Sequence, residues 1–457
     1  MVRALYSLVT RLAGPLLRRK LARRAVAEPG YAVAVDERFG RYSVPPDTGR
    51  VWIHAVSLGE TRAAAILLER LRAQLPGLRL LLTHGTATGR AEGEKLLRPG
   101  DVQVWQPWDT PGAVARFLDH FQPRIGILME TEVWPNLTAA CAARAIPLVL
   151  ANARLNPQSL AKARRMGWLS RPAYGALAAV WAQTEADAAR LRCLGAPVRG
   201  VFGNLKFDAT PDAALLEKGR AWRAALGRPV ILLASSREGE EALFLKEILD
   251  HPSVEWSQSA IDSEVEQTPS GVQWLIVPRH PQRFDEVAAL VGQHGFALSR
   301  RSNWGDAPPL ALNASARLAA DADAPAKEGQ GVRPTIWLGD SLGEMALYYG
   351  LADVALLGGS FAPLGGQNLI EAAACGCPVL MGPHTFNFAE ASELAQAGGA
   401  AQAVADMAAA LAAARALVAD PVRQRAVAAA SLAFAAAHRG AAARTAGAVL
   451  ALIRQPA

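Results

Sequence analysis

After residue 50, short apolar runs alternate with longer segments in which apolar positions recur at helical spacing. Runs of this kind are typical of parallel strands that are covered on both faces. Strands that alternate with helices predict α/β domains, and two such series predict two doubly wound, Rossmann-like domains. The candidate strands are residues 51–57, 78–83, 124–129, 147–151 and 180–183, and then 230–235, 273–278, 335–338, 353–358 and 378–381.

Turn-forming residues cluster between the two series, in residues 205–213 (LKFDATPDA). We therefore predict a first domain over residues 25–210 and a second over residues 211–457, which ends in Ala-rich helices. Two polar or low-complexity stretches interrupt the pattern of the second domain and are interpreted as surface insertions. They are residues 251–271 and 314–333.

The first 24 residues have a different pattern, in which apolar residues follow one face of a helix and arginines lie off it. No run of 18 uncharged apolar residues occurs in the chain, so a clean membrane-spanning helix is not predicted. An amphipathic helix on an anionic membrane surface fits better, the alternative being a helix docked on its own protein. Pro15 kinks it in either case. The stripe is Leu5, Leu8, Val9, Leu12, Leu16 and Leu17.

The amino-acid composition excludes several classes of protein. Apolar residues make up 51% of the 457 residues and charged residues 19%, which excludes a disordered or coiled-coil protein. The net charge of +7 equals the charge of residues 1–24, so a basic segment precedes a neutral body, and nucleic-acid binding is not favoured. Four cysteines exclude a disulfide scaffold and fit a reducing cytoplasm. Cys375 and Cys377 are interpreted as small buried residues.

Ligands of an open α/β sheet bind at the carboxyl ends of its strands, so polar residues that follow the predicted strands are candidate site residues. Glu60 follows the first strand. Its carboxylate is either a general base at the mouth of a cleft or a favourable charge at the start of the helix that it opens.

Two further candidates in the first half of the chain are Glu130 and Lys206. Glu130 follows a strand together with Glu132, and a capping role for Thr131 or Glu132 is the alternative interpretation. Lys206 lies at the predicted domain junction, where it either holds an anionic substrate or is a solvated linker residue.

The second half of the chain has five polar or glycine-rich segments, which come after four successive predicted strands. Backbone N–H groups at helix starts, and glycines before them, suit an anion or a phosphate. Glu371, one turn into a helix, is placed to accept hydrogen bonds from ribose hydroxyls. The segments are 234–241 (ASSREGEE), 278–281 (PRHP), 339–344 (GDSLGE), 358–360 (GGS) and 365–371 (GGQNLIE).

Motifs for other chemistry are absent or weak. No G-x-G-x-x-G follows a strand, and there is no Walker A or H-E-x-x-H sequence. The D-x-D at 321–323 lies in a low-complexity insertion, so no metal site is predicted. GDSLG fits the nucleophile elbow of a serine hydrolase, with Ser341 as nucleophile and Asp353 and His384 in triad order. This hydrolase is the alternative enzyme class, although it leaves the carboxylates of the first domain unused.

Eight segments, taken in order, closely resemble bacterial 3-deoxy-D-manno-octulosonic acid (Kdo) transferases, which add Kdo to the lipid A precursor. The similarity covers nearly the whole chain, to about residue 390. The segments are SLGE at 57–60, ETEVWPNL at 130–137, NARL at 152–155, GNLKFD at 203–208, EGEE at 238–241, VPRHPQRF at 277–284, GDSLGE at 339–344 and MGPHTFNF at 381–388.

The resemblance implies an inverting GT-B glycosyltransferase of lipopolysaccharide inner-core biosynthesis, with two Rossmann-like domains facing a cleft. The first domain would receive the lipid A precursor (lipid IVA), and the second would hold CMP-Kdo. No metal or other cofactor is implied. Residues 1–24 would be the anchor to the anionic cytoplasmic face of the cell inner membrane.

The resemblance also implies roles for individual residues. Glu60 would be the base that deprotonates the acceptor hydroxyl, which attacks the anomeric carbon of Kdo as CMP leaves. Glu130 and Lys206 stand at positions assigned to transition-state stabilisation. Lys206 would face the anionic CMP and Kdo carboxylate, and Glu130 would hold a cationic partner or the acceptor. The implied CMP contacts are Pro278, Arg279, Leu342, Gly343, Glu344, Asn368, Leu369, Ile370 and Glu371.

Two residues depart from the family pattern. Arg237 and Gln367 stand where the family commonly has histidine, and we expect both to alter contacts on the donor side. A binding protein for a nucleotide sugar, without turnover, is the non-enzymatic alternative, against which intact Glu60, Glu130 and Lys206 argue.

Overall fold

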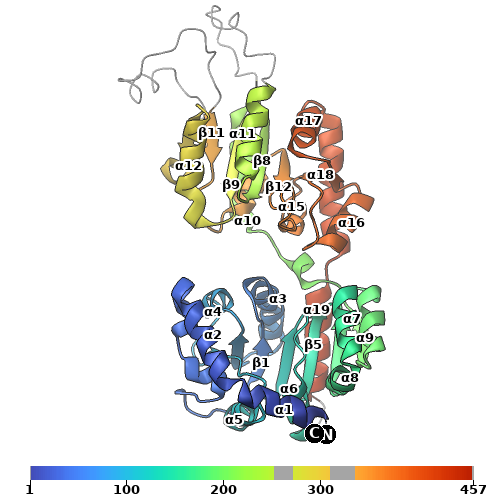
Figure 1. The fold of residues 1–457 in the computed structure, drawn as a ribbon. Coiled ribbons are helices and arrows are strands. Elements are labelled where there is room, and N and C mark those ends of the chain that lie inside the picture. The colour runs from blue at the N-terminus through green and yellow to red at the C-terminus, as the bar shows by residue number, and fades with distance from the viewer. Residues whose placement is uncertain (1, 252–270, 309–334, 455–457) are drawn as a thin grey trace, which may run out of the picture. The chain divides into compact units, whose positions relative to one another are not determined.

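The structure is a computed structural model that describes residues 2–251, 271–308 and 335–454 (Figure 1). It forms two compact units, Met1–Asp208 with His438–Ala457, and Ala209–Ala437, which we call the first and second domains. Apart from residues 251 and 271, the two predicted insertions lie outside the described residues, as does the D-x-D at 321–323.

The first domain is built on a parallel sheet of seven strands in the order β3-β2-β1-β4-β5-β6-β7. Its central strands are buried along their whole length because helices cover both faces, and this explains their apolar composition. The strand order reverses between β1 and β4, and ligands bind at the carboxyl ends of strands at such a point. The strands are β1 (Val51–His54), β2 (Leu80–His84), β3 (Val102–Trp105), β4 (Ile125–Met129), β5 (Leu148–Ala153), β6 (Ala179–Ala182) and β7 (Val198–Val201).

The helices of the first domain pack on these two faces. One buried core lies between the sheet and helices that include α3 and α19, and the other lies between the sheet and helices that include α5 and α9. The helices are α1 (Val2–Leu12), α2 (Gly14–Ala27), α3 (Leu58–Gln74), α4 (Ala87–Glu94), α5 (Pro111–Phe121), α6 (Pro135–Ala143), α7 (Pro157–Arg165), α8 (Gly167–Gly175), α9 (Glu185–Cys193) and α19 (Ala441–Arg454), with short turns η1 (Pro29–Ala32), η2 (Val35–Phe39) and η3 (Leu205–Asp208).

The second domain has the same architecture, with a parallel sheet in the order β10-β11-β9-β8-β12-β13-β14 that reverses between β8 and β12. Its strands are β8 (Val230–Ser236), β9 (Gln273–Pro278), β10 (Ala297–Arg300), β11 (Thr335–Leu338), β12 (Val354–Leu357), β13 (Val379–Met381) and β14 (Ala401–Ala403). Its helices are α10 (Ala213–Leu226), α11 (Glu240–Asp250), α12 (Phe284–Gln293), α14 (Met345–Leu351), α15 (Leu369–Ala374), α16 (Ala389–Ala397), α17 (Met407–Val418) and α18 (Pro421–Ala437), with short turns η6 (Pro281–Arg283) and η7 (Arg301–Asn303).

The last helix corrects the predicted domain assignment. We assigned residues 211–457 to the second domain, but residues 438–457 belong to the first. The inner face of α19, including Ala442, Val449 and Leu450, is buried in the core beneath the first sheet. The Ala-rich composition predicted the helices correctly but carries no information on which sheet each one covers.

One stretch of the described chain, Pro421–Arg454, is long and apolar enough to cross a membrane by length and composition. The structure divides this stretch into α18 and α19, which belong to different domains. Each of them buries part of its surface in protein, as core helices of globular proteins do. The one apolar helical stretch of spanning length in the described residues is therefore C-terminal and not N-terminal, and it is divided between two helices.

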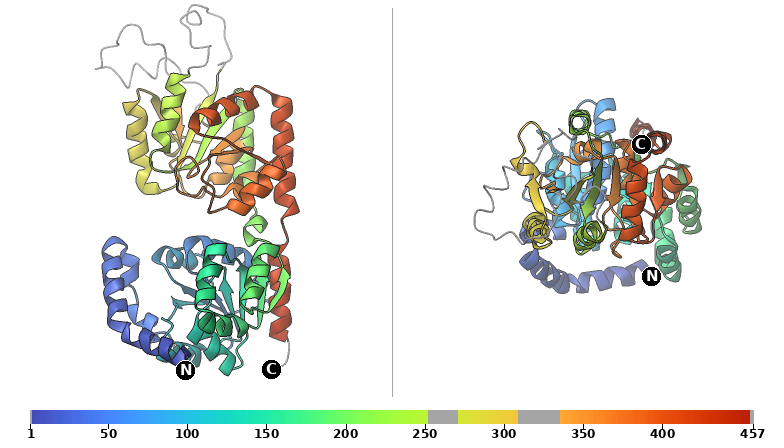
Figure 2. Two further views of the ribbon diagram at one scale, coloured as in Figure 1. Left: turned by 45° about the vertical axis from the view of Figure 1, so that its right-hand side comes forward. Right: turned by 90° about the horizontal axis from the view of Figure 1, so that it is seen from above.

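Residues 2–27 form α1 and α2, which meet at Ala13 with Pro15 in the first turn of α2, so the predicted break occurs there. Both helices lie along the outside of the first domain (Figure 2). The hydroxyl of Tyr6 donates to Oδ2 of Asp109 (3.0 Å) and that of Ser7 to Oδ1 of Asn136 (2.8 Å), so a polar edge of α1 is docked on the domain. The apolar stripe is not covered: Leu12 is 71% exposed.

Candidate functional site

Glu60 lies in the first turn of α3, directly after β1. The Oγ of Ser57 caps this helix by accepting a hydrogen bond from the N–H of Glu60. The carboxylate of Glu60 in turn accepts bonds from the N–H of Val56 (2.8 Å) and the hydroxyl of Ser57 (3.2 Å). This arrangement is closely related to a capping box. Glu60 thus satisfies the helix terminus, and the same bonds hold its carboxylate at the carboxyl end of β1.

The environment of Glu60 shifts its protonation. Burial raises the pKa of its carboxyl group from 4.5 to about 7, and the negative charges of Glu130 and Glu132 also raise it, against the hydrogen bond from Val56. A base whose pKa lies near neutral pH is partly ionised there and still basic enough to accept a proton efficiently.

Glu130 follows β4, the strand next to β1 in the sheet. Its φ of 57° lies in the left-handed region, which is uncommon for a residue other than glycine. Its N–H donates to the carbonyl of Ala151 (3.0 Å), and its carbonyl accepts from the N–H of Arg154 (3.2 Å), so the turn is bound to the end of β5 on both sides. The residue is only 3% exposed.

Two cations flank the carboxylate of Glu130. Nζ of Lys206 lies 3.8 Å from Oε1, and Nε of Arg154 lies 2.7 Å from Oε2. The residues come from the ends of β4 and β5 and from the segment after β7, so three strand ends meet at this carboxylate. Glu130 is expected to hold either a cationic partner or the acceptor, and the structure places two cationic partners beside it.

The backbone around Lys206 is fixed by its neighbours. The N–H of Leu205 donates to Oδ1 of Asn152 (3.0 Å), a buried residue near the end of β5 with a φ of 52°. The N–H of Lys206 donates to Oδ1 of Asn204 (3.0 Å). Lys206 is therefore not on an unstructured linker, because the turn η3 places it beside Glu130.

The other end of η3 is bound to the last helix. The carboxylate of Asp208 accepts hydrogen bonds from the N–H groups of Gly440 and Ala442 at the start of α19, and Phe207 stacks on His438 at a centroid distance of 4.9 Å. The last helix thus holds in place the turn that carries Lys206.

Glu132 is a third carboxylate near Glu60, and we did not name it as a site residue. Nε1 of Trp134 donates to its Oε2 (2.8 Å), and burial raises the pKa of Glu132. The sequence signal was present, since ETEVWPNL carries two carboxylates at one strand end. Arg154 was likewise missed, although it lies in NARL.

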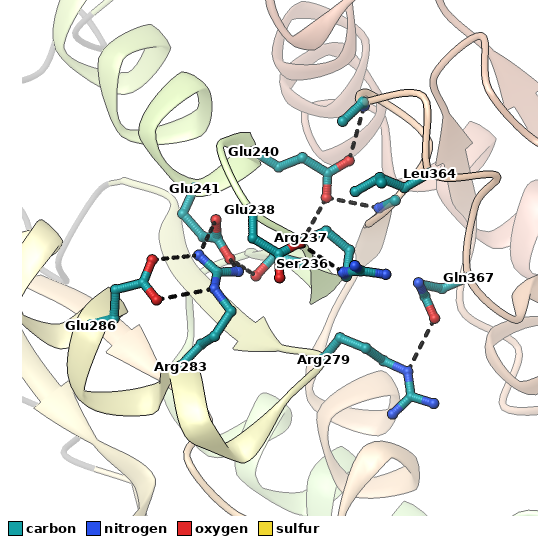
Figure 3. Close-up of polar contacts among 12 residues, drawn as sticks. Ser236, Arg237, Glu238, Glu240, Glu241, Arg279, Arg283, Glu286, Leu364 and Gln367 are labelled. Carbon is teal, nitrogen blue, oxygen red and sulfur yellow. Dashed lines mark hydrogen bonds and ion pairs between the residues drawn. The ribbon is translucent and has the colours of Figure 1, made fainter. Parts of the chain in front are cut away.

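In the second domain Arg279 follows β9, where its N–H donates to the carbonyl of Ser236 at the end of β8 (3.0 Å). Its Nε donates to Oε1 of Gln367 (3.1 Å), as Figure 3 shows. Gln367 therefore orients Arg279. Arg237 pairs through Nε with Glu238 (3.0 Å).

Two adjacent carboxylates in EGEE are fully buried (Figure 3). Glu240 accepts hydrogen bonds from the backbone N–H groups of Arg237, Gly359, Phe361 and Ala362. We expected backbone N–H groups of 234–241 to be available to an anion, but the N–H of Arg237 already donates to a carboxylate of the chain itself.

Glu241, the second of these carboxylates, accepts from Ser236 (2.6 Å) and from both terminal nitrogens of Arg283 (2.6 and 3.1 Å). Arg283 also pairs with Glu286 (3.1 Å). The EGEE segment therefore ties α11 to the loop after β12 and to the turn after β9.

The segment 342–344 follows β11. Leu342 is exposed. Gly343 has a φ of 82°, a backbone conformation that favours glycine, although no atom lies close enough to crowd a Cβ atom there. Glu344 accepts hydrogen bonds from Arg301 (2.9 Å) and from Ser341 (2.5 Å).

The hydrolase alternative is wrong, because its triad is not assembled. The hydroxyl of Ser341 contacts Glu344 and Tyr348 (2.5 Å), whereas Asp353 accepts from Arg223 and from the N–H of Val230. Ser341 follows β11 and Asp353 precedes β12, so they lie at opposite edges of a parallel sheet.

The segment 368–371 begins α15. Oδ1 of Asn368 accepts from the N–H of Ile370 (3.2 Å), so Asn368 is the helix cap. Leu369 and Ile370 are fully buried, which leaves their backbone and the side chains of Asn368 and Glu371 as possible ligand contacts. In the described part of the chain, no group of three or more His, Cys, Asp and Glu residues is placed to hold a metal ion.

Comparisons with known proteins decide the family. A family model described as 3-deoxy-D-manno-octulosonic-acid transferase (kdotransferase) matches residues 34–209. A 3-deoxy-D-manno-octulosonic acid transferase of Bordetella pertussis is 45% identical over 97% of this chain and 98% of its own length. The chain belongs to the 3-deoxy-D-manno-octulosonic acid transferase family. A Kdo transferase of Haemophilus influenzae is 32% identical over 85% of this chain and 84% of its own.

Solved structures of other proteins are also similar to this chain, and the first of the two below supports the fold. UDP-GlcNAc 2-epimerase from Neisseria meningitidis, bound to UDP-GlcNAc, covers 88% of this chain and 100% of its own at 14% identity, with a TM-score of 0.53. A C-terminal CMP-Kdo binding domain of WaaA from Acinetobacter baumannii covers 49% of this chain and 98% of its own at 23% identity, with a TM-score of 0.36. The predicted family, its transferase activity and a GT-B-like pair of parallel α/β sheets are thus confirmed.

Proposed function

We propose that this Kdo transferase moves Kdo from CMP-Kdo to a lipid A precursor, with Glu60 as the general base. The observation that carries this proposal is the carboxylate of Glu60, held at the carboxyl end of β1 by two hydrogen bonds with a pKa of about 7. Glu130, whose charge acts on Glu60, and the two cations paired with it, Lys206 and Arg154, supply the charges that the reaction needs.

In the proposed step Glu60 takes the proton of a sugar hydroxyl of the acceptor. The freed electron pair of that oxygen forms a bond to the anomeric carbon of Kdo, and the bond from this carbon to the phosphate oxygen of CMP breaks. CMP leaves with that electron pair, and attack from the opposite face inverts the configuration. The step needs no metal in this proposal, since Lys206 faces the developing negative charge.

Glu130 orients the cations in this proposal. Its carboxylate is almost fully buried and lies between Lys206 and Arg154, so it holds both cationic groups in place. It also raises the pKa of Glu60, which makes that group a stronger base.

We propose that the second domain binds CMP-Kdo through the predicted contacts. These residues lie at or after the carboxyl ends of β9, β11 and β12, the edge where ligands of doubly wound sheets bind. The guanidinium of Arg279, oriented by Gln367, suits the phosphate of the nucleotide, and Glu371 suits ribose hydroxyls. The proposed contacts are Pro278 and Arg279, Leu342, Gly343 and Glu344, and Asn368, Leu369, Ile370 and Glu371.

We further propose that α1 and α2 lie on the cytoplasmic face of the inner membrane. The uncovered stripe of Leu5, Leu8, Val9, Leu12 and Leu16 accompanies seven basic residues in residues 1–24, which suits an anionic lipid surface. Replacing Leu8 and Leu12 by Gln should move the protein from the membrane to the soluble fraction, whereas Val422→Gln, which changes an exposed residue of the second domain, should not. Unchanged fractionation of the double variant would contradict surface binding by this stripe.

The activity is tested by mass spectrometry of a tetraacylated lipid A precursor incubated with freshly generated CMP-Kdo and the full chain, in the presence of EDTA. The acceptor should gain the mass of one or more Kdo units. Glu60→Ala should lose this product, and Glu69→Gln, which changes an exposed carboxylate of the same helix, should keep it. Full activity of Glu60→Ala would overturn the role of Glu60, and no product from the native chain would overturn the reaction itself.

A further inference from the structure

Arg154 occupies a distinctive place at the end of β5. Its backbone N–H donates to the carbonyl of Glu130, and its Nε lies 2.7 Å from the carboxylate of the same residue. Although Glu130 is almost completely buried, the side chain of Arg154 is 51% exposed. The guanidinium is therefore attached at one side to a buried anion and open to solvent at the other.

The pairing leaves the outer part of the guanidinium group unused. Within residues 2–251, 271–308 and 335–454, Glu130 is the one residue that forms an ion pair with the Arg154 side chain, and the nearest contact is through Nε. The parallel N–H groups of arginine match two oxygens of a phosphate or carboxylate, a match that the point charge of lysine cannot make. The contact with Glu130 holds the side chain in place before a ligand arrives, which lowers the entropy lost on binding.

The charges around Arg154 call for such a contact. Glu60, Glu130 and Glu132 place three carboxyl groups close together, and these repel an anionic substrate unless cations compensate. Lys206 and Arg154 are the two cations that pair with Glu130 in the described residues. The substrates of the proposed reaction carry phosphate groups and, in Kdo, a carboxylate.

We propose that Arg154 is a further substrate-binding residue of this transferase, whose outer nitrogens bind a phosphate or carboxylate group of a substrate. The inference rests on the proposed function, since it assumes that the transfer takes place beside Glu60. The group comes either from the acceptor, as a phosphate of the lipid A precursor, or from the donor, as the carboxylate of Kdo.

The test compares Arg154→Gln and Arg154→Lys with the native full chain, using steady-state kinetics in which acceptor and donor are varied separately. Loss of a charged, two-point contact should raise the KM of one substrate roughly ten- to hundredfold in the Gln variant, and less in the Lys variant. Arg144→Gln is the matched control. Arg144 lies just after α6 and pairs with Asp119 of α5, so this variant should leave both KM values unchanged.

The pattern of constants separates the sources. A raised KM for the acceptor, absent with an acceptor that lacks its phosphates, assigns the group to the acceptor. A raised KM for CMP-Kdo assigns it to the donor carboxylate. A fall in kcat alone, or a shift of the acid limb of the pH profile alone, would show that Arg154 only positions Glu130 and would overturn substrate binding. Loss of product from the native chain would instead mean that the proposed function has failed.

Discussion

Each domain buries glutamates at the carboxyl edge of its sheet, but the two sets are satisfied differently. In the second domain Glu240 accepts four backbone hydrogen bonds, and Glu241 is bound by a serine and by both terminal nitrogens of an arginine. In the first domain Glu60 accepts two bonds, and Glu130 faces two cations whose side chains reach solvent.

This difference shows that burial alone does not identify a reacting carboxylate. Burial raises the pKa of Glu240 as well as that of Glu60, yet each oxygen of Glu240 accepts two hydrogen bonds from the chain, whereas each oxygen of Glu60 accepts one. Glu240 and Glu241 therefore hold loops together, whereas the carboxylates of the first domain keep capacity for a proton or a ligand. Unsatisfied capacity, more than a perturbed pKa, separates the two regions.

The largest expected effects come from neutralising one glutamate in each region. Glu241→Gln leaves Arg283 with only the exposed Glu286 as a partner, so the free energy of unfolding should fall by about 2–4 kcal/mol. Glu130→Gln should instead lower kcat roughly a hundredfold or more, because Lys206 and Arg154 lose the carboxylate that holds them. Calorimetry and the transfer assay on both variants measure the two effects.

The contrast predicts that the Glu130 variant loses little stability and that the Glu241 variant loses little activity. Glu130→Gln should change the free energy of unfolding by less than about 1 kcal/mol, since Lys206 and Arg154 both reach water. Glu241→Gln should keep most of its activity at a temperature where it remains folded. A Glu130 variant that is as unstable as the Glu241 variant would erase the distinction between the two regions.

The pH dependence of activity sharpens the same comparison with a smaller effect. Glu60 must be ionised to accept a proton, so kcat/KM should rise about tenfold per pH unit below pH 7 and level off above it. Glu132→Gln removes a negative charge that raises this pKa, so it should move the acid limb to lower pH.

The control for this measurement is Glu69→Gln, which changes an exposed carboxylate farther along α3. Its profile should coincide with that of the native chain. An acid limb that stays in place or moves to higher pH in Glu132→Gln would mean that Glu132 does not act on the base.

The sheets show what hydrophobic pattern can and cannot predict. All ten predicted strands are present, but each sheet has two more, and these four strands, β3, β7, β10 and β14, are the sheet edges. Edge strands are covered less completely, so residues such as Arg199 and Gln402 replace the continuous apolar run. The pattern therefore detects burial on both faces, and it misses strands that lack it.

The site shows a similar limit. Glu60 and Glu130 are candidates because they follow predicted strands, and Lys206 because it lies at the predicted domain junction; β1, β4 and β7 bring the three to one edge. The distance between Lys206 and Glu130 depends on Asn152 and on the capping of α19 by Asp208, contacts between segments far apart in the chain. Arg154 was missed because an arginine after a strand has no distinctive signal until its partner is known.

The smallest expected effect is on the free energy of unfolding, which ionisation of the buried Glu60 lowers at neutral and higher pH. Its pKa is about 7 in the folded chain against 4.5 as the ordinary value, so its stabilising contribution is complete below pH 4.5 and is lost as the pH rises through 7. Glu60→Gln cannot ionise and should therefore be more stable than the native chain at pH 8 by about 1–2 kcal/mol relative to the difference at pH 5.

Urea unfolding of both proteins at pH 5 and pH 8 measures this difference, with Glu69→Gln as the control that should show none. A glutamate whose role ended with capping α3 would be best bound as an anion, and its replacement would lower stability more at pH 8 than at pH 5. A catalytic base that destabilises the fold should give the opposite result: its Gln variant gains stability at pH 8 relative to pH 5 and loses transfer activity. A Gln variant that is less stable at pH 8 would thus place Glu60 with Glu240 and Glu241 as a structural carboxylate.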